Sequence, residues 1–118
     1  MTRARPRTAR QTLAAAVPEK AFTQQVIGLA RMHGWRSAHF RPAQNARGDW
    51  RTPVAGDGKG FPDLVLLRGG RVIVAELKAE GEYPRADQRA WLDAWRAAGA
   101  EVNVWRPSDL DAIQQVLR

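Results

Sequence analysis

Hydrophobic residues at helical spacing mark the first regular element of the chain. Apolar side chains recur every three to four positions, at Phe22, Val26, Leu29 and Ala30. This period predicts an amphipathic helix over residues 18–33. Pro18 suits the first helical turn, and Gly34 stands where a helix commonly ends. The next stretch, WRSAHF at residues 35–40, predicts a short strand.

Two apolar runs on either side of Gly69 and Gly70 predict a β-hairpin. The strands are expected over residues 64–68 and 71–78, because β-branched runs around a Gly-Gly pair are typical of a two-residue turn. Both faces of this hairpin carry apolar side chains. A sheet that is apolar on both faces needs other elements to cover both of them.

Two helices with a strand between them are expected after the hairpin. The first helix ends at Gly99 and has four residues on one face, Gln88, Trp91, Leu92 and Trp95. Residues 101–105, EVNVW, predict a strand that runs parallel to strand 71–78, because a helix precedes it and such crossovers are right-handed. A last helix begins at Pro107 and Ser108. The order α-β-β-β-α-β-α predicts an α/β fold with a mixed central sheet between helices.

Two stretches have no sustained period. Residues 1–17 hold four Arg and no acid, and are expected to form a basic, mobile N-terminal arm with a short helical stretch near residues 13–17. Residues 41–60 are rich in Gly, Pro and Arg and predict a long loop, and a loop of this length is expected to be either functional or disordered. Four basic residues of this loop are candidates for nucleic-acid binding, Arg41, Arg47, Arg51 and Lys59. Residues 18–118 are then expected to form a single domain.

The chain is strongly basic. Its 118 residues carry a formal net charge of +7, and sixteen of the nineteen basic residues are Arg. The planar guanidinium group of Arg suits two-pronged contact with phosphate. This charge favours a polyanionic partner such as DNA. The alternative is a solvated basic surface of an Arg-rich protein.

The rest of the composition bears on the compartment. The chain has no Cys, which excludes disulfides and thiolate metal sites. No apolar run approaches the roughly 20 residues that span a bilayer, and no signal peptide is recognised. A cytoplasmic location is therefore expected.

The predicted hairpin brings two acids together. If Arg68 pairs with Arg71 across the turn, Asp63 lies opposite Glu76, with Cβ atoms roughly 4.5–5.5 Å apart. Lys78 lies on the same face as Glu76. Two such carboxylates share a proton, pair with a cation or hold a divalent metal ion. A structural ion cluster of Lys78 with both acids is an equal alternative at this point.

Polar residues on neighbouring helices could add to this group. Glu19 and Gln25 each lie three positions from Phe22, and Gln88 lies three before Trp91. Residues three apart share a helix face, so all three are expected near the inward side. Each of them could equally be a hydrogen-bonded core residue or lie at the edge of the apolar face.

These residues resemble a known nuclease signature. Pro62-Asp63, twelve intervening residues and Glu76-Leu77-Lys78 match the pattern of the PD-(D/E)XK superfamily. From about residue 19 to residue 117 the chain resembles a VRR-NUC domain, the virus-type replication-repair nuclease branch of that superfamily. The matching stretches are EKAFTQQVIGLARMHGW, GFPDLVLLRGGRVIVAELKAE, DQRAWLDAWRAAGAEVNVW and RPSDLDAI. The resemblance implies a restriction-endonuclease-like sandwich.

The resemblance also implies a role for each matching residue. Asp63 and Glu76 would ligate Mg²⁺ or Mn²⁺, together with the backbone carbonyl of Leu77. Lys78 would position or activate the attacking water and stabilise charge on the phosphate. These roles agree with the chemistry of phosphodiester hydrolysis, which needs a hydroxide and relief of negative charge on oxygen.

Two helix residues complete the set that the resemblance implies. Gln88 matches a helix glutamine that supports the catalytic site. Glu19 matches an acid of the first helix that contributes to metal binding directly or through water, with Gln25 as its rival.

The function expected from this resemblance is metal-dependent cleavage of branched DNA. Stand-alone domains of this kind resemble Holliday junction resolvases of replication, recombination or repair, and they act as homodimers on two symmetric strands. A non-cleaving nucleic-acid-binding module with a nuclease-like fold is the main alternative. The presence of Asp63, Glu76 and Lys78 argues against it. A structural accessory of a phage or mobile-element replication machine is a third possibility.

Overall fold

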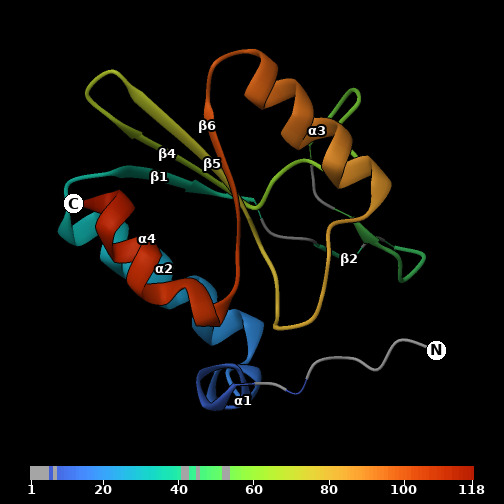
Figure 1. Ribbon diagram of the computed structural model, residues 1–118. Helices are drawn as coiled ribbons and strands as arrows, with labels where there is room; N and C mark the ends of the chain where they lie inside the picture. Colours follow the sequence, from blue (N-terminus) through green and yellow to red (C-terminus); the bar gives the residue numbers. More distant parts are fainter. Residues whose placement is uncertain (1–5, 7, 41–42, 45, 52–53) are drawn as a thin grey trace.

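A four-stranded mixed sheet forms the centre of the protein. The computed structural model describes residues 6, 8–40, 43–44, 46–51 and 54–118. The strand order is β1-β4-β5-β6 (Figure 1). The strands are β1 (Arg36–His39), β4 (Leu64–Arg68), β5 (Arg71–Leu77) and β6 (Glu101–Trp105). The pairs β1–β4 and β4–β5 are antiparallel and β5–β6 is parallel, as predicted for the strand that follows a helix.

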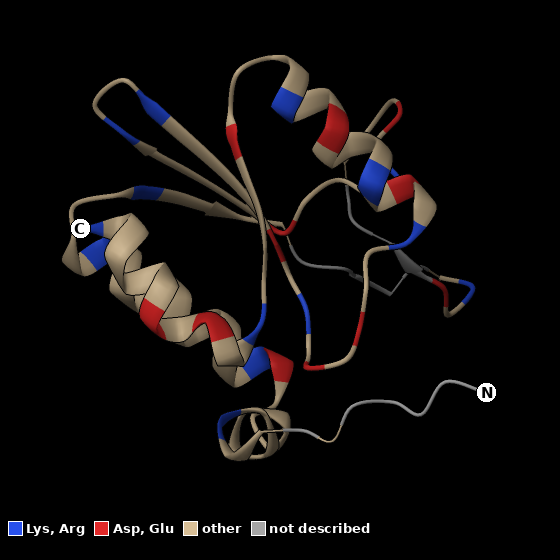
Figure 2. Ribbon diagram, viewed as in Figure 1, with Lys and Arg blue, Asp and Glu red and all other residues tan. Residues whose placement is uncertain are grey.

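Four helices accompany the sheet in the described part of the chain. They are α1 (Ala9–Ala15), α2 (Glu19–Met32), α3 (Ala86–Ala97) and α4 (Leu110–Leu117), and a 3₁₀ turn η1 (Pro107–Asp109) leads into α4. The predicted α/β class with a mixed, helix-flanked sheet is therefore confirmed. Lys and Arg lie on helices, strands and loops around the fold, so the positive charge is not confined to one element (Figure 2). No helix of the described residues is long and apolar enough to cross a membrane.

Helices α2 and α4 cover one face of the sheet (Figure 1). The hairpin side chains of this face are fully buried, namely Leu64, Leu66, Ile73 and Ala75. They pack in one cluster with Phe22, Val26 and Ala30 of α2 and with Ile113 and Leu117 of α4. The 3.6-residue period of both helices supplies these apolar stripes, and their burial is the main stabilising contribution to the fold.

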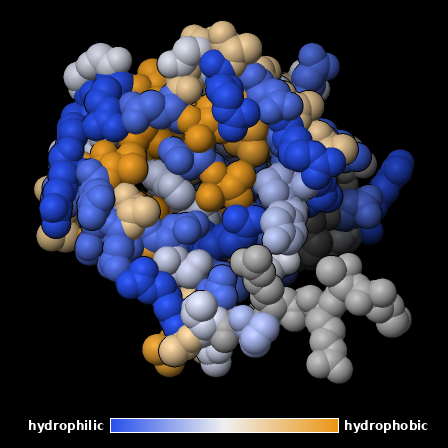
Figure 3. All heavy atoms as spheres, viewed as in Figure 1, coloured by the Kyte–Doolittle hydropathy of each residue, from blue (hydrophilic) through white to orange (hydrophobic). Residues whose placement is uncertain are grey.

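The opposite face of the sheet is only partly covered. Helix α3 packs near β6, and Val74 is fully buried. Leu67 on the same face is 45% exposed, and Val65 and Val72 are half-buried. The expectation that both faces need cover is thus met in full on one side and in part on the other. Hydrophobic side chains reach the surface over the strands and beside α3, among hydrophilic neighbours (Figure 3).

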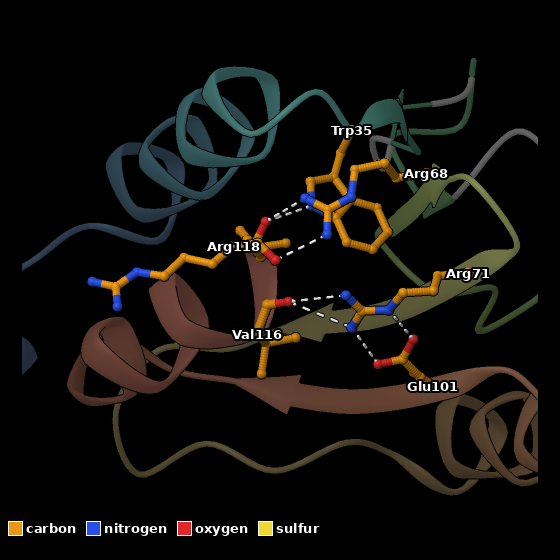
Figure 4. A network of polar contacts seen from close by, with 7 residues as sticks. Trp35, Arg68, Arg71, Glu101, Val116 and Arg118 are labelled. Atoms are coloured by element: carbon orange, nitrogen blue, oxygen red, sulfur yellow. Dashed lines mark hydrogen bonds and ion pairs between the residues drawn. The ribbon is translucent and has the colours of Figure 1, made fainter.

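A polar clamp holds the tip of the hairpin. The guanidinium groups of Arg68 and Arg71 lie 4.5 and 5.0 Å from the centre of the Trp35 ring. Arg68 donates to the backbone carbonyl of Leu117 at 2.8 Å, and Trp35 Nε1 donates to the same oxygen at 2.8 Å. Arg71 pairs with Glu101 of β6 at 2.7 Å (Figure 4). The tip is therefore tied to α4 and to the neighbouring strand.

The segment over residues 41–60 contains more structure than its composition predicts. Two short strands, β2 (Ala43–Gln44) and β3 (Trp50–Arg51), pair antiparallel. Gly48 in their connection has a φ of 85°, a conformation that glycine adopts without steric cost. Two-residue strands are too short to produce a recognisable alternation, which is why the pattern predicted only a loop.

The basic N-terminal segment contains helix α1. The helix lies earlier than the stretch near residues 13–17 that the sequence predicted, because Thr8 and Gln11 form a capping box that starts it at Ala9. Arg10 pairs with Asp111 of α4 at 2.9 Å. The mobility expected of residues 1–17 stays a prediction, and residues 1–5 and 7 of this arm lie outside the described residues.

Candidate functional site

The register of the hairpin agrees with the prediction that brings the two acids together. Arg68 pairs with Arg71 and Leu64 with Ala75, so Asp63 and Glu76 are the next opposed positions beyond the ladder. Asp63 Oδ2 accepts a hydrogen bond of 2.8 Å from the backbone N–H of Leu77. The Asp63 carboxylate therefore turns toward the second strand and the neighbourhood of Glu76.

An aromatic cluster holds the strand that carries Asp63. The ring of Phe61 meets Phe40 and Trp91 edge-on, with centroid distances of 4.8 and 4.9 Å. The backbone N–H of Phe40 donates to the carbonyl of Asp63 at 2.8 Å. The end of β1, the start of β4 and helix α3 consequently meet beside the acids.

Glu76 is a buried carboxylate with an unsatisfied oxygen. Its residue is 1% exposed, and within the described residues Oε2 has no hydrogen-bond partner. Burial and, after it, the neighbouring Asp63 carboxyl raise the pKa of Glu76 to about 9. Lys78 and Arg85 oppose this shift without reversing it. A buried carboxyl whose pKa is raised in this way either holds a proton at neutral pH or binds a cation.

Gln88 connects the third helix to Glu76. Its Oε1 accepts a hydrogen bond of 2.9 Å from the backbone N–H of Arg85, which caps the start of α3. Its Nε2 lies 3.4 Å from Glu76 Oε1, a long hydrogen bond. The side chain is buried. Gln88 therefore fixes the start of the helix and contacts the acid, as its place on the inward face predicted.

Lys78 follows the end of β5, beside the carboxyl end of β6. Its backbone N–H donates to the carbonyl of Trp105 at 3.0 Å. Residues two apart on a strand share a face, so the Lys78 side chain leaves on the side of Glu76. Among the ion pairs of the described residues, none joins Lys78 to Asp63 or Glu76. Lys78, Asp63 and Glu76 therefore do not form the compact structural ion cluster that was the alternative.

Glu19 lies near this group without joining it. Burial and the charge of Asp63 raise the pKa of Glu19, and the charge of Lys78 lowers it, so the three groups are within electrostatic reach. Within the described residues, no set of three or more His, Asp or Glu side chains could hold a metal ion. A metal-binding role of Glu19 therefore stays a prediction. Gln25, its rival, instead lines a shallow hollow between α1, α2 and the start of α4.

The donor set fits a hard divalent cation. The unpartnered Oε2 of Glu76 is buried and lies close to a second carboxylate, Asp63. Carboxylate and carbonyl oxygens are the ligands that Mg²⁺ and Mn²⁺ prefer. The backbone carbonyl of Leu77 is the further oxygen expected for such an ion. A bound cation would also offset the burial and the charge of Asp63 that raise the pKa of Glu76.

The structure describes only some of the basic residues of 41–60 that are candidates for nucleic-acid binding. Arg47 and Lys59 are exposed. Arg41 lies outside the described residues, and Arg51 is described only as a member of β3. Trp91 Nε1 donates to the carbonyl of Lys59 at 3.1 Å, which anchors this part of the loop on α3.

Gly60 lies where the loop touches the first turn of α3. Its φ is +82°, and an added Cβ would lie 2.7 Å from the backbone carbon of Asp87. We expect Gly60→Ala to destabilise the protein by about 1–3 kcal/mol or more, through backbone strain and overpacking. Gly70→Ala is the matched control, because no atom lies within 4 Å of its added Cβ. Urea unfolding measures both, and equal stability of the two variants would contradict this close approach.

Three residues near the site were not selected from the sequence. The charge of Arg85 partly opposes the raised pKa of Glu76. Arg106 follows β6, beside Lys78. Tyr83 lies in the loop that joins β5 to α3. The run GEYPRAD predicts only a turn, so spacing gave no signal for Tyr83 or Arg85. Arg106 could have been found by continuing the parallel register past strand 101–105.

Comparison of the chain with models of protein families, with curated proteins and with solved structures finds no match. The class of the molecule is defined by its own geometry. It is an α/β protein with a mixed sheet, and the open end of its central hairpin carries a buried glutamate, a half-buried aspartate and a lysine.

Proposed function

We propose that this protein is a metal-dependent nuclease that hydrolyses phosphodiester bonds in DNA. The observation that carries the proposal is the buried Glu76 carboxyl beside Asp63, with one oxygen unpartnered and Lys78 within electrostatic reach. A buried carboxyl next to a second carboxyl is costly in a metal-free fold, so the arrangement favours a role in holding a cation.

More particularly, we propose a nuclease of the VRR-NUC type in the PD-(D/E)XK superfamily. The order α2-β1-β4-β5-α3-β6-α4 is compatible with the restriction-endonuclease-like sandwich that the resemblance implies. Branched DNA is the proposed substrate, as for a Holliday junction resolvase, in replication, recombination or repair. The bacterial or phage-infected cytoplasm stays the expected setting.

The resemblance implies the proposed roles, and the positions of the residues are compatible with them. Asp63, Glu76 and the Leu77 carbonyl would hold Mg²⁺ or Mn²⁺, with Glu19 at the edge of the site. When bound, such an ion lowers the pKa of water and draws charge from phosphate oxygens. Lys78 would orient the attacking water and stabilise the charge that develops on the phosphate.

Gln88 would hold the Glu76 carboxylate in one orientation. The amide is anchored at its oxygen by the backbone N–H of Arg85 and reaches Glu76 with its nitrogen. A donor fixed in this way favours one rotamer of the acid and resists its rotation on metal loss. This makes Gln88 a positioning residue of the site.

A second copy of the chain is part of the proposal. The partly covered sheet face, with Leu67 45% exposed, offers apolar area for such a contact. Two sites related by a two-fold axis suit a junction in which two symmetric strands are cut.

A cleavage assay tests the proposal. Labelled four-way junction, flap and linear duplex are incubated with the purified protein in Mg²⁺, Mn²⁺ or EDTA. We expect metal-dependent cleavage of the branched substrates and none in EDTA. Binding without cleavage in either metal would favour the non-cleaving module, and no DNA affinity would favour the structural accessory.

The binding arm of the same experiment uses two salt concentrations. Contacts of Arg and Lys with phosphates release counterions, so affinity falls with salt. The net charge of +7 leads us to expect a loss of at least about tenfold between 50 and 200 mM salt. An affinity that does not change with salt would contradict DNA as the ligand.

A further inference from the structure

An exposed aromatic side chain stands in the loop that joins β5 to α3. Tyr83 is 75% exposed, although it lies between the segment that carries Lys78 and the helix that carries Gln88 (Figure 1). The loop has a defined turn, in which the backbone N–H of Glu82 donates to the carbonyl of Ala79 at 3.1 Å. The ring is therefore presented to solvent by an ordered backbone.

One face of the Tyr83 ring is covered by an arginine. The guanidinium of Arg106 lies 4.8 Å from the ring centroid, within the range of a cation–π contact. Arg106 donates two hydrogen bonds to the carbonyl of Glu82, at 2.7 and 3.0 Å. The arginine thus holds both the loop and the ring, and the high exposure of Tyr83 shows that much of the ring stays open.

This pair lies at the border of the acid site. In the parallel ladder Leu77 pairs with Trp105, so Arg106 follows β6 as Lys78 follows β5. Neighbouring strands lie about 4.8 Å apart, which places the two cationic residues side by side at the carboxyl ends of the strands. The loop residue Glu82 also contributes to the raised pKa of Glu19, whose largest charged influence is Asp63.

We propose that Tyr83 and Arg106 form a stacking platform for an unpaired base of DNA next to the phosphate that is cut. The inference rests on the proposed nuclease function. An aromatic ring with an open face stacks with any base, and a neighbouring arginine adds cationic attraction for the strand. Bases inside a regular duplex are paired and stacked on each other, so they cannot use the platform. The substrate class is therefore DNA with unpaired nucleotides at the cleavage site, as at a flap or an open branch point.

Fluorescence of 2-aminopurine tests this platform without cleavage. The probe is a flap DNA with 2-aminopurine as the first unpaired base beside the branch, in EDTA, against a blunt duplex of the same length. The wild-type protein and Tyr83→Phe are expected to quench the probe by stacking, and Tyr83→Ala is not. Tyr83→Ala is also expected to lose between about 5-fold and about 150-fold in affinity for the flap, with little change for the duplex.

Met32→Ala is the matched control. Met32 is 79% exposed at the end of α2, and its neighbour His33 accepts a hydrogen bond from Arg68 near the hairpin tip, away from the acids. This variant is expected to bind and quench like the wild type. Thermal unfolding checks that Tyr83→Ala is folded, as expected for a change at an exposed side chain.

The outcomes separate the platform from the nuclease. The platform proposal is wrong if Tyr83→Ala quenches the probe and binds the flap like the wild type. It is also wrong if this variant loses equal affinity for flap and duplex. Both results count against the platform whether or not Mg²⁺-dependent cleavage occurs. If quenching depends on Tyr83 but no metal supports cleavage, the platform stands and the nuclease function fails. If the protein binds neither DNA, both fail.

Discussion

Exchange of Asp63 for asparagine is expected to lower metal-dependent cleavage by about three orders of magnitude or more. The substitution removes a negative charge that would hold the cation. The asparagine carbonyl can still accept the hydrogen bond that Asp63 Oδ2 takes from the Leu77 N–H, so the local backbone should be kept. Single-turnover cleavage of a labelled junction measures the rate, and fluorescence anisotropy measures DNA affinity, which should be nearly unchanged.

Asp93→Asn provides the control for this substitution. Asp93 is an exposed acid of α3 that pairs with Arg96, and its loss should not affect cleavage. Lys78→Ala is expected to behave like the Asp63 variant, with cleavage lost and binding largely retained. Wild-type cleavage by either variant would remove these residues from the reaction, and a parallel loss of binding would assign them to DNA affinity instead.

Exchange of Glu76 for glutamine is expected to stabilise the metal-free protein while it abolishes metal-dependent cleavage. The folded-state pKa of Glu76 is raised to about 9, whereas its ordinary value is 4.5. Between these values the folded state holds a proton that the unfolded state releases. The stabilising contribution of the protonated acid is therefore complete below the ordinary pKa and is lost as the pH rises toward 9, with a slope of up to about 1.4 kcal/mol per pH unit.

The glutamine variant has the size of the protonated acid and no proton to lose. Its stability should therefore lack this slope, and its advantage over the wild type should grow from pH 5 to pH 8. Urea unfolding in EDTA at several pH values measures the difference. Mg²⁺ should stabilise the wild type and not the variant, because the ion binds only the carboxylate form.

Glu101→Gln is the contrasting control. The Arg71 guanidinium lowers the pKa of Glu101, the opposite direction to Glu76. Its glutamine variant should lose stability above the ordinary pKa of the acid rather than gain it. A Glu76→Gln variant that is less stable than the wild type at pH 8 in EDTA would show that the buried carboxyl is satisfied without a metal ion.

The hairpin and its acids could be predicted from the sequence because their geometry is local. A Gly-Gly turn fixes the opposed pairs as far as Leu64 and Ala75, which leaves Asp63 and Glu76 as the next opposed positions. Strand 101–105 was predictable as a parallel neighbour for a similar reason, since a helix lies between it and β5.

The features that could not be predicted depend on contacts between distant segments. Trp91 was placed on a core face by its spacing, but its Nε1 binds the backbone of the loop near Lys59. The contact of Arg106 with Tyr83 joins the end of one strand to the loop after another. No period or short motif records such pairings, and the same holds for the incomplete cover over Leu67.

The clamp at the hairpin tip has a consequence for a site that it never touches. Arg68 and Arg71 are opposed in the ladder; Arg68 is bound to α4, and Arg71 is bound to β6 and also to α4. A slip of one residue would break both attachments at once and would turn the two acids to opposite sides of the sheet. A substitution at the hairpin tip would therefore lower the affinity of the acids for a cation, because the register of the two strands is fixed there. The tip lies about 17 Å along the strand from Asp63.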